Sequence, residues 1–463
     1  MAEAFGTEGN PWRVAVVGSG PAGFYAAEEL LKQDDPKVAV DMFDRLPTPY
    51  GLVRGGVAPD HQKIKTVIKL YERTAGRPRF RFFGNVAFGR DLSLAEMLTH
   101  YHQVLFCTGA ETDRRMGIPG EDLAGSHPAT TFVGWYNGHP DYRHLSFDLS
   151  AERVAVIGVG NVAMDVTRIL ARPLAELAAT DIADYALEAL KESQVREIYL
   201  LGRRGPAQAA FTNPEIRELA NIEGVDLVVR PDELELDPAS AEWLATQKDP
   251  TNQRNVDILR GQIEKGEGNQ PRKIRVRFLA SPVEVLGSDR VEGLRIERNE
   301  LVKNEWGGLS AKGTGQTEEL EVQLVFRSIG YMGTALPDLP FDERKGTIPN
   351  REGRVVDAAT EQPLPRLYVA GWIKRGPTGV IGTNKQDAIN TVKCMLEDLP
   401  AVAPGADFDP DPGRVEAVLA GKNVRFVSFA DWKRLDQLEV ERGRPQGRPR
   451  QKFTSVEEML AQL

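Results

Sequence analysis

Cysteine is scarce in this sequence, and a long apolar run is missing altogether. Cys107 and Cys394 are the only two cysteines among 463 residues, and no C-x-x-C pair occurs. These facts exclude a dithiol relay, a cysteine-ligated iron-sulfur cluster and a disulfide scaffold. The apolar neighbours of both cysteines predict buried packing residues. Neither a secretory signal nor a run of 18 or more apolar residues is present, so we expect no transmembrane segment and a cytoplasmic protein.

Net positive charge is missing as well. The formal net charge is -9 and the isoelectric point is about 5.5, so no overall field attracts the chain to nucleic acid. An acidic partner would therefore have to meet a local basic patch. The length corresponds to roughly two or three domains of about 150 residues or more.

The sequence does contain a nucleotide-binding pattern near its start. Residues 13–17 form a short apolar run, and a helical periodicity follows the turn made by Gly18, Gly20 and Gly23 with G-x-G-x-x-G spacing. In such a unit the first glycine permits the tight turn and the second lets a pyrophosphate approach the backbone. The third lets the helix pack closely, so that the phosphates meet unpaired amides at the helix N-terminus.

The next predicted strand completes this unit. Residues 38–43 end in Asp44, where a carboxylate is expected to accept hydrogen bonds from ribose hydroxyls. A lone glycine pattern is weak evidence, whereas strand, helix, second strand and terminal acid in register indicate a nucleotide site.

Residues 46–61 are too rich in proline and glycine for a helix and are predicted to wrap a flat ligand. Residues 1–11 are expected to be loosely attached.

A second unit of the same kind begins at a strand predicted for residues 154–157. It continues as Gly158, Gly160 and Ala163, with the spacing G-x-G-x-x-A, and then as a helical stretch. The chain thus carries two separate dinucleotide-binding patterns.

The second unit differs from the first at its second strand. That strand, predicted for residues 198–201, is followed by Arg203 and Arg204 in place of an acid. Two guanidiniums suit a ribose 2′-phosphate, and therefore NADP rather than NAD, although adjacent arginines on a turn can also be merely solvated. A predicted helix from Asn213 then carries two acids on one face, Glu215 and Glu218.

Six longer segments extend these signals over nearly the whole chain. They are VVGSGPAGFYAA, PYGLVRGGVAPDH, RFRFFGNV, VAVIGVGNVAMDV, LLGRRGPAQAAFT and VAGWIKRGPTGVIGTNK. With these segments the chain resembles the ferredoxin-NADP reductases of the adrenodoxin reductase type, the branch found in actinobacteria and mitochondria. The resemblance implies an α/β fold with two Rossmann-like dinucleotide-binding domains. Residues 1–112 and 331–463 would form the FAD domain, and residues 113–330 an inserted NADP domain.

The resemblance also implies which residues form the site. The residues implied to contact FAD are Ala22, Asp44, Leu52, Val86, Trp372, Gly379, Val380 and Ile381. Those implied to contact NADP are Val159, Gly160, Asn161, Val162, Arg203, Arg204, Glu215 and Gly379. His61 and Glu218 match an imidazole and acid pair that the family keeps near the flavin, where His61 would tune the flavin, handle its proton or only pack. Asp44 stands where members of the family usually have Glu. The shorter carboxylate would change the affinity for FAD, not the identity of the cofactor.

The implied function is electron transfer from NADPH through FAD to a ferredoxin-type iron-sulfur protein. Three alternatives stay open. One is an electron transferase like the small subunit of glutamate synthase, whose cluster-binding cysteines have no counterpart here. The others are a flavin monooxygenase and a nucleotide-sensing protein without turnover.

An acidic ferredoxin would need a local basic face. Residues 254–277 are the first candidate, because they hold seven Lys and Arg residues against three acids. The tail residues 442–452 form a second basic cluster, and either cluster can be only a solvated surface. The last helix is predicted to begin with a capping box made by Thr454 and Glu457.

Overall fold

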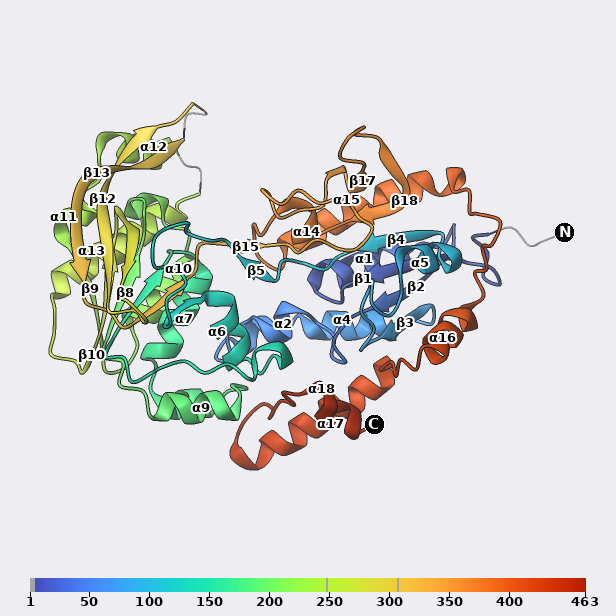
Figure 1. The fold of residues 1–463 in the computed structure, drawn as a ribbon, viewed down its shortest axis with the longest axis horizontal. Helices are drawn as coiled ribbons and strands as arrows, with labels where there is room; N and C mark the ends of the chain where they lie inside the picture. The colour runs from blue at the N-terminus through green and yellow to red at the C-terminus, as the bar shows by residue number, and fades with distance from the viewer. Residues whose placement is uncertain (1–4, 247–248, 306–307) are drawn as a thin grey trace.

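The computed structural model describes residues 5–246, 249–305 and 308–463. These residues form two lobes that lie side by side, each built around a sheet (Figure 1). A two-stranded antiparallel ladder of β5 (Thr112–Asp113) and β15 (Tyr331–Met332) lies where the chain leaves the first lobe and where it returns. The second lobe is therefore inserted into the first.

The sheet of the first lobe has the strand order β16-β17-β18-β4-β1-β2-β3. Its five strands from β18 to β3 are parallel, and β16 and β17 extend it antiparallel. The strands are β1 (Trp12–Val17), β2 (Val38–Phe43), β3 (Phe80–Phe83), β4 (Gln103–Phe106), β16 (Asn350–Arg351), β17 (Arg354–Val356) and β18 (Pro363–Val369).

Both faces of this sheet are covered, as its nearly continuous apolar strands require. Val14 and Val16 of β1 belong to the core beneath helices α1 and α15, whereas Ala15 and Val17 face the core that includes Met97 of α5. The helices of this part are α1 (Pro21–Leu31), α2 (Leu52–Gly55), α3 (Gln62–Lys65), α4 (Ile68–Ala75), α5 (Leu94–His100), α14 (Trp372–Arg375) and α15 (Thr383–Asp398).

The sheet of the second lobe is parallel throughout, in the order β6-β14-β7-β8-β10-β9. Its strands are β6 (Ser126–Pro128), β7 (Arg153–Ile157), β8 (Glu197–Leu201), β9 (Val225–Val229), β10 (Arg272–Arg277) and β14 (Leu324–Arg327). A separate antiparallel sheet consists of β11 (Ala280–Leu286), β12 (Gly293–Lys303) and β13 (Leu309–Leu320).

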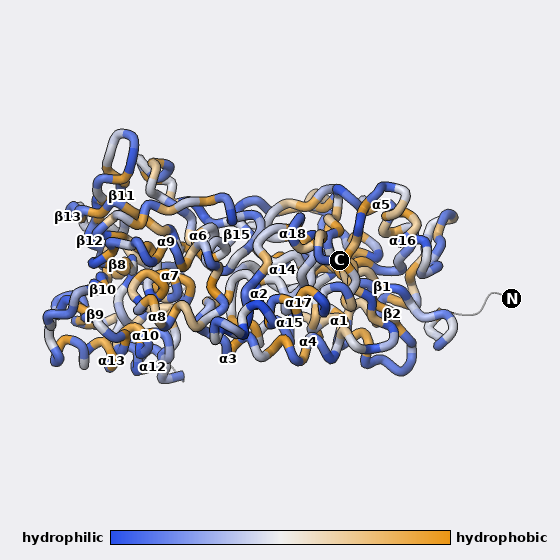
Figure 2. Tube along the Cα trace, turned by 90° about the horizontal axis from the view of Figure 1, so that it is seen from below, coloured by the Kyte–Doolittle hydropathy of each residue, from blue (hydrophilic) through white to orange (hydrophobic). Residues whose placement is uncertain are grey.

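Helices cover one face of the second sheet and the antiparallel sheet covers the other. Val154 and Val156 of β7 lie in the core shared with the helices, and Ala155 and Ile157 lie in the core shared with β11 and β12. The helices are α6 (Ala129–Tyr136), α7 (Asn161–Ala171), α8 (Leu174–Ala178), α9 (Asp184–Lys191), α10 (Asn213–Ala220), α11 (Pro231–Leu234), α12 (Pro238–Thr246) and α13 (Thr251–Lys265). Seen from below, apolar segments run through both lobes between hydrophilic edges (Figure 2).

The C-terminal part returns along the underside of the first lobe towards the second. It contains α16 (Pro412–Gly421), α17 (Phe429–Gly443) and α18 (Val456–Ala461), and the loop between α17 and α18 reaches α9 (Figure 1). This loop, residues 444–455, is called the C-terminal strap below. Single 3₁₀ turns occur at Pro140–Tyr142, Pro206–Gln208, Leu399–Ala401 and Arg444–Gln446.

Three local predictions differ from the structure. Residues 5–11 are attached firmly, because the Lys37 amide donates to the Gly6 carbonyl at 2.8 Å and the Phe5 ring lies 4.4 Å from that of His102; residues 1–4 lie outside the described chain. The segment 46–61 contains one helical turn, α2, in which the amides of Arg54 and Gly55 donate to the Gly51 carbonyl.

The third difference is the cap of the last helix. Ser455, not Thr454, accepts the hydrogen bond at the start of α18, from the Glu458 amide at 3.2 Å. In the described part of the chain, no helix is long and apolar enough to cross a membrane.

Candidate functional site

The first glycine turn has the geometry that a bound pyrophosphate requires. A Cβ at Gly18, where φ is +105°, would lie 2.5 Å from the Cys107 carbonyl oxygen, and one at Gly23 would lie 2.1 Å from the Gly18 carbonyl oxygen. A Cβ at Gly20 would meet no atom within 4 Å. The first and third glycines are thus required by the protein's own packing, and the second borders open space at the N-terminus of α1, as a phosphate cradle does.

Asp44 lies beside this turn, at the end of β2. One carboxylate oxygen accepts hydrogen bonds from the Ser19 amide at 3.0 Å and from the Ser19 hydroxyl, and the other accepts from the Leu46 amide at 3.0 Å. A carboxylate offers about four acceptor positions. Two bonds from the turn and one from Leu46 therefore fix the group and leave acceptor capacity for a ribose hydroxyl.

The residues implied to contact FAD lie in two kinds of surroundings. Leu52 and Val380 are 39% and 58% exposed, so each presents apolar surface that a flat aromatic ligand would cover. Trp372 stacks on Tyr331 at 5.5 Å, and its indole N–H is buried with no partner among the described residues. These three residues fit a bound flavin: two apolar surfaces and one free donor.

Three further parts of the implied FAD site also have a place in the fold: Ala22, Val86 and the loop 379–381. Ala22 is buried, and a Cβ added at Gly371 would lie 2.6 Å from the Cβ of Ala22. Val86 is buried, and its amide donates to the Asp44 carbonyl at 2.9 Å. The loop of Gly379, Val380 and Ile381 leads into α15, with φ of +78° at Gly379.

The second glycine turn repeats the first. A Cβ at Gly158, where φ is +126°, would lie 2.1 Å from the Ser328 carbonyl oxygen, whereas one at Gly160 would meet nothing within 4 Å. Asn161 begins α7 and accepts a hydrogen bond from the Thr212 amide at 3.0 Å. Val159 and Val162 are half-buried against the core of the second lobe.

Arg203 and Arg204 follow β8 after one residue, Gly202. Arg203 is exposed and Arg204 half-buried, and neither forms an ion pair within the described chain. Burial and the neighbouring charge of Arg203 lower the pKa of Arg204. Two adjacent guanidiniums without an acid are suited to an anionic ligand.

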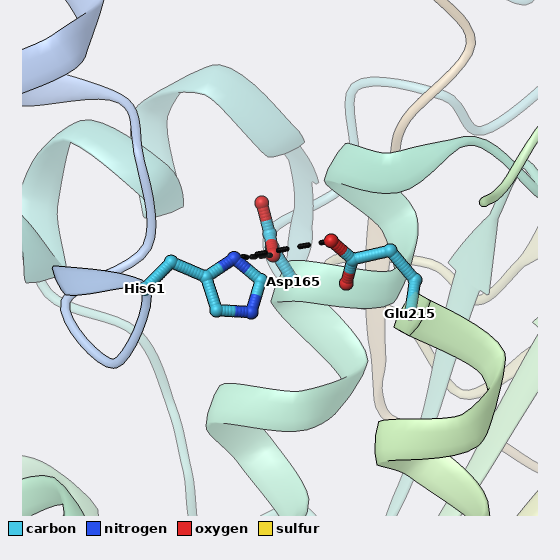
Figure 3. Close-up of side chains that lie close together, drawn as sticks. All are labelled: His61, Asp165 and Glu215. Carbon is cyan, nitrogen blue, oxygen red and sulfur yellow. Dashed lines mark ion pairs between the residues drawn. The ribbon is translucent and has the colours of Figure 1, made fainter. Parts of the chain in front are cut away.

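His61 lies at the contact between the lobes, close to Asp165 and Glu215 of the second lobe (Figure 3). Its Nε2 is 2.9 Å from a Glu218 carboxylate oxygen, and its Nδ1 is 3.8 Å from Glu215 and 3.9 Å from Asp165. The structure thus brings together the imidazole and acid that the resemblance pairs.

A buried arginine that the sequence analysis did not identify organises this cluster. The Arg168 side chain is fully buried and donates to Asp60 at 2.7 and 3.1 Å, to Asp165 at 2.6 Å and to Glu215 at 2.9 Å. The i,i+3 spacing of Asp165 and Arg168 was its one visible signal.

Glu215 is buried, not on a solvated face. Burial and the nearby charge of Asp165 raise the pKa of Glu215 to about 7, against the opposing charges of Arg168 and His61. One group at this contact therefore changes charge near neutral pH.

The first basic segment proposed for a partner is mostly paired internally. Arg275 pairs with Glu197 and Glu267, and Arg277 with Glu233 and Glu318. Arg272 donates to main-chain carbonyls, and Lys273 pairs with Glu267. The exposed remainder is on α13: Arg254, Arg260 and Lys265. Of these, Arg260 lies 3.8 Å from Asp257 on the same helix.

Part of the tail cluster is internal, because Arg448 and Lys452 are buried, whereas Arg442 and Arg444 are exposed. Arg448 is buried in the C-terminal strap and donates to the carbonyls of Thr180 and Ile182. Lys452 is buried and donates to the Asn137 carbonyl at 3.1 Å. These cations attach the strap to the second lobe.

Comparison with known proteins assigns the chain to a family. Residues 12–205 match the family described as pyridine nucleotide-disulphide oxidoreductase. The chain is 48% identical to NADPH-ferredoxin reductase FprA of Mycobacterium tuberculosis over 97% of this chain and 98% of the relative. It is 42% identical to the mitochondrial NADPH:adrenodoxin oxidoreductase of Arabidopsis thaliana over 97% and 95%. The chain belongs to the ferredoxin-NADP reductases of the adrenodoxin reductase type.

A solved structure agrees with this assignment over the whole fold of the reductase. Mycobacterium tuberculosis FprA in complex with NADPH superposes with a TM-score of 0.91 at 47% identity, covering 98% of this chain and 99% of that chain. The comparisons confirm the predicted α/β fold with two dinucleotide-binding units, the oxidoreductase class and the cofactors FAD and NADP. The roles of individual residues stay predictions.

Proposed function

We propose that this reductase oxidises NADPH and passes the electrons through FAD to an acidic ferredoxin-type iron-sulfur protein in the cytoplasm. One observation carries the proposal: near-full-length similarity to NADPH-ferredoxin reductases coincides with two glycine turns that each border open space at the second glycine. A single glycine turn would serve one nucleotide, whereas this chemistry needs two.

We assign the two nucleotides to the two lobes. The FAD domain comprises residues 1–112 and 331–463, and the NADP domain residues 113–330. The strands support this division, because β1–β4 and β16–β18 share one sheet. Strands β6–β14 form the two sheets of the other lobe, and the β5–β15 ladder lies where the chain passes between the lobes.

Bound FAD would accept a hydride from NADPH and release electrons singly. The protein's part is binding and orientation. On the FAD side we assign the residues Gly18, Gly20, Ala22, Gly23, Asp44, Leu52, Val86, Trp372, Gly379, Val380 and Ile381. On the NADP side we assign Val159, Gly160, Asn161, Val162, Arg203, Arg204, Glu215 and Gly379.

His61 and Glu218 are assigned to proton handling at the contact between the lobes. The 2.9 Å hydrogen bond between them lets a proton move between imidazole and carboxylate. Neither group needs to act as a nucleophile, so replacing either should slow turnover without abolishing hydride transfer.

Turnover tests the function. The pure protein with NADPH and ferredoxin should reduce cytochrome c continuously, and with ferricyanide it should turn over without ferredoxin. Bleaching of the flavin absorbance near 450 nm without turnover would refute the proposal and indicate a nucleotide sensor.

Coenzyme choice tests the NADP side. Charged hydrogen bonds contribute about 1.5–3 kcal/mol each, and about 1.4 kcal/mol is tenfold. Arg203→Ala combined with Arg204→Ala should lower kcat/KM for NADPH at least about a hundredfold and leave NADH nearly unchanged. An equal loss for both coenzymes would contradict the assignment.

The docking face is assigned to the exposed cations of α13. Steering by such a patch raises the association rate and is screened over about 8 Å at physiological salt. Arg254→Glu combined with Arg260→Glu should slow ferredoxin reduction and flatten its salt dependence, with ferricyanide reduction intact. Lys393→Glu with Arg434→Glu makes the same charge change on the first lobe, where both side chains are exposed. If only this control pair affects ferredoxin, the docking face lies on the first lobe.

A further inference from the structure

The turn that carries Arg203 and Arg204 is held by three successive main-chain carbonyls. The Gly202 carbonyl accepts from the Ala280 amide at 3.0 Å, and the Arg204 carbonyl accepts from the Leu279 amide at 3.1 Å. The middle carbonyl, that of Arg203, accepts from the side-chain amide of Asn299 at 2.8 Å. The Gly202 amide also donates to the Arg277 carbonyl at 2.8 Å. These four hydrogen bonds all join the turn to the segment from β10 to β12, and only the one from Asn299 comes from a side chain.

Asn299 is placed for this contact by an irregularity of its strand. The pairing of β12 with β13 shifts register between Glu297 and Asn299, and such a bulge redirects a side chain. Asn299 is only 4% exposed. Its backbone amide donates to the Leu279 carbonyl at 2.7 Å, and its side-chain amide also donates to the Ser281 hydroxyl at 2.8 Å. The same residue thus fixes the Arg203 carbonyl and the neighbouring Leu279, whose φ is +53°.

The guanidinium groups of the two arginines are not held by these main-chain bonds. Neither guanidinium pairs with an acid within the described chain, and Arg203 is exposed. Long side chains on a mobile turn lose conformational entropy when a ligand orders them, which weakens binding. A turn fixed beforehand avoids that loss, but only for a ligand that both guanidiniums contact.

We propose that Asn299 is a positioning residue for coenzyme selection: its amide holds the Arg203 carbonyl and so fixes the two guanidiniums for the 2′-phosphate of NADPH. This inference rests on the proposed assignment of Arg203 and Arg204. The effect is confined to ligands that carry a 2′-phosphate, because Asn299 is itself buried and acts only through the turn.

Binding to the FAD-loaded protein tests the inference without turnover. Isothermal titration should show that Asn299→Ala raises the Kd for 2′,5′-ADP about tenfold, the order expected for one lost buried hydrogen bond. The Kd for 5′-AMP should not change. In steady-state assays the KM for NADPH should rise by the same factor, with kcat within about twofold and with NADH kinetics unchanged.

Two further variants sharpen the test. Ser281→Ala removes the other partner of the Asn299 amide but keeps the bond to Arg203, so it should bind 2′,5′-ADP like the parent. Asn299→Asp keeps the size of the side chain and replaces the donor by an acceptor facing the carbonyl. It should lose at least as much affinity as Asn299→Ala, and it serves where the alanine variant does not fold.

The outcomes separate this inference from the function on which it rests. If Arg203→Ala with Arg204→Ala keeps the preference for 2′,5′-ADP, the arginine assignment fails. If that pair loses the preference while the Asn299 variants keep it, the role of Asn299 is overturned. An equal loss of affinity for 2′,5′-ADP and 5′-AMP in the Asn299 variants, or a loss of equal size in Ser281→Ala, would also overturn it.

Discussion

Replacing Arg168 by Met should weaken both the stability of the protein and the contact between its lobes. The guanidinium is fully buried and joins Asp60 of the first lobe to Asp165 and Glu215 of the second. Methionine is of similar length and apolar, so the substitution removes the charge and its hydrogen bonds with little change of volume. Three carboxylates would then lie close together around an apolar side chain.

The free energy of unfolding that is lost depends on which cations remain beside each of the three acids. Removing one partner of a buried ion pair costs about 3–5 kcal/mol, because the remaining charge stays buried. Asp60 retains Arg172 at 2.9 Å, so its charge stays compensated, whereas Asp165 and Glu215 lose their main cation. For a cooperative unit of about 150–250 residues, such a loss lowers Tm by roughly 6–20 °C.

The pH dependence of this loss has a definite sign. The pKa values of Asp165 and Glu215 are already raised by burial, that of Glu215 to about 7, and Arg168 opposes the rise for both. Without Arg168 both folded pKa values rise further above those of the unfolded chain. The folded variant then binds protons that the unfolded chain releases, so its stability deficit is larger near pH 8 than near pH 5.5.

Differential scanning calorimetry at these two pH values measures the prediction. Arg153→Met removes the pairs of a half-exposed arginine with Glu321 and Glu197, and Glu197 keeps Arg275 as a partner. This control should cost less than about 1 kcal/mol at either pH. Asp60→Asn should cost less in the Arg168→Met background than in the parent, since the partner is already gone. The reasoning is refuted if Arg168→Met behaves like Arg153→Met, or if its deficit is the same at both pH values.

Three further predictions concern other parts of the molecule. Gly18→Ala places a Cβ 2.5 Å from a carbonyl oxygen and should reduce the amount of bound FAD, measured as the ratio of 450 nm to 280 nm absorbance. Gly117 also has a positive φ, but a Cβ there would meet no atom within 4 Å, so Gly117→Ala should keep its FAD. Glu215→Gln should gain stability over the parent by at most about 3 kcal/mol as pH rises from about 4.5 to 7, because folding disfavours the ionised Glu215 of the parent, whose pKa is raised. A difference in thermal melts that does not change with pH would contradict this. Arg448→Ala should lower the free energy of unfolding by about 3 kcal/mol through loss of its charged hydrogen bonds, and a changed salt dependence of ferredoxin reduction would show that the strap also docks the partner.

The sequence predicted the two nucleotide units closely, because their signals are local. The first strand was expected at 13–17 and is Trp12–Val17, and the second was expected at 38–43 and is Val38–Phe43. Apolar runs bounded by glycine turns fix such strands within a few residues. The glycine roles followed from spacing alone, and the distances around Gly18 and Gly23 agree with them.

Contacts between distant residues were beyond local reasoning. Asp60 and Arg168 are 108 positions apart, and Arg448 and Asp184 are 264 apart, so no periodicity connects them. Counting charges failed for the same reason. Arg275 belongs to a basic run in the sequence, but β10 lies beside β8, and the Arg275 side chain forms an ion pair with Glu197 of β8. The helical turn α2 was missed because it depends on the Gly51 carbonyl, in a residue whose φ is +49°.

These distant contacts share a chemical character that bears on function. Charged groups join the lobes at the His61 cluster, at Lys65 with Asp181, and at the C-terminal strap. Although burial raises the pKa of Asp181, the charges of Lys452 and Lys65 outweigh it and lower that pKa, so this acid stays ionised.

Ion pairs of this kind require specific directions, unlike apolar contacts, and they are satisfied only in one relative orientation of the lobes. Hydride transfer needs reacting atoms held about 3–3.5 Å apart. We therefore interpret the charged contact as a feature that fixes the second glycine turn relative to the first, so that a coenzyme bound at one turn is aligned with a coenzyme bound at the other.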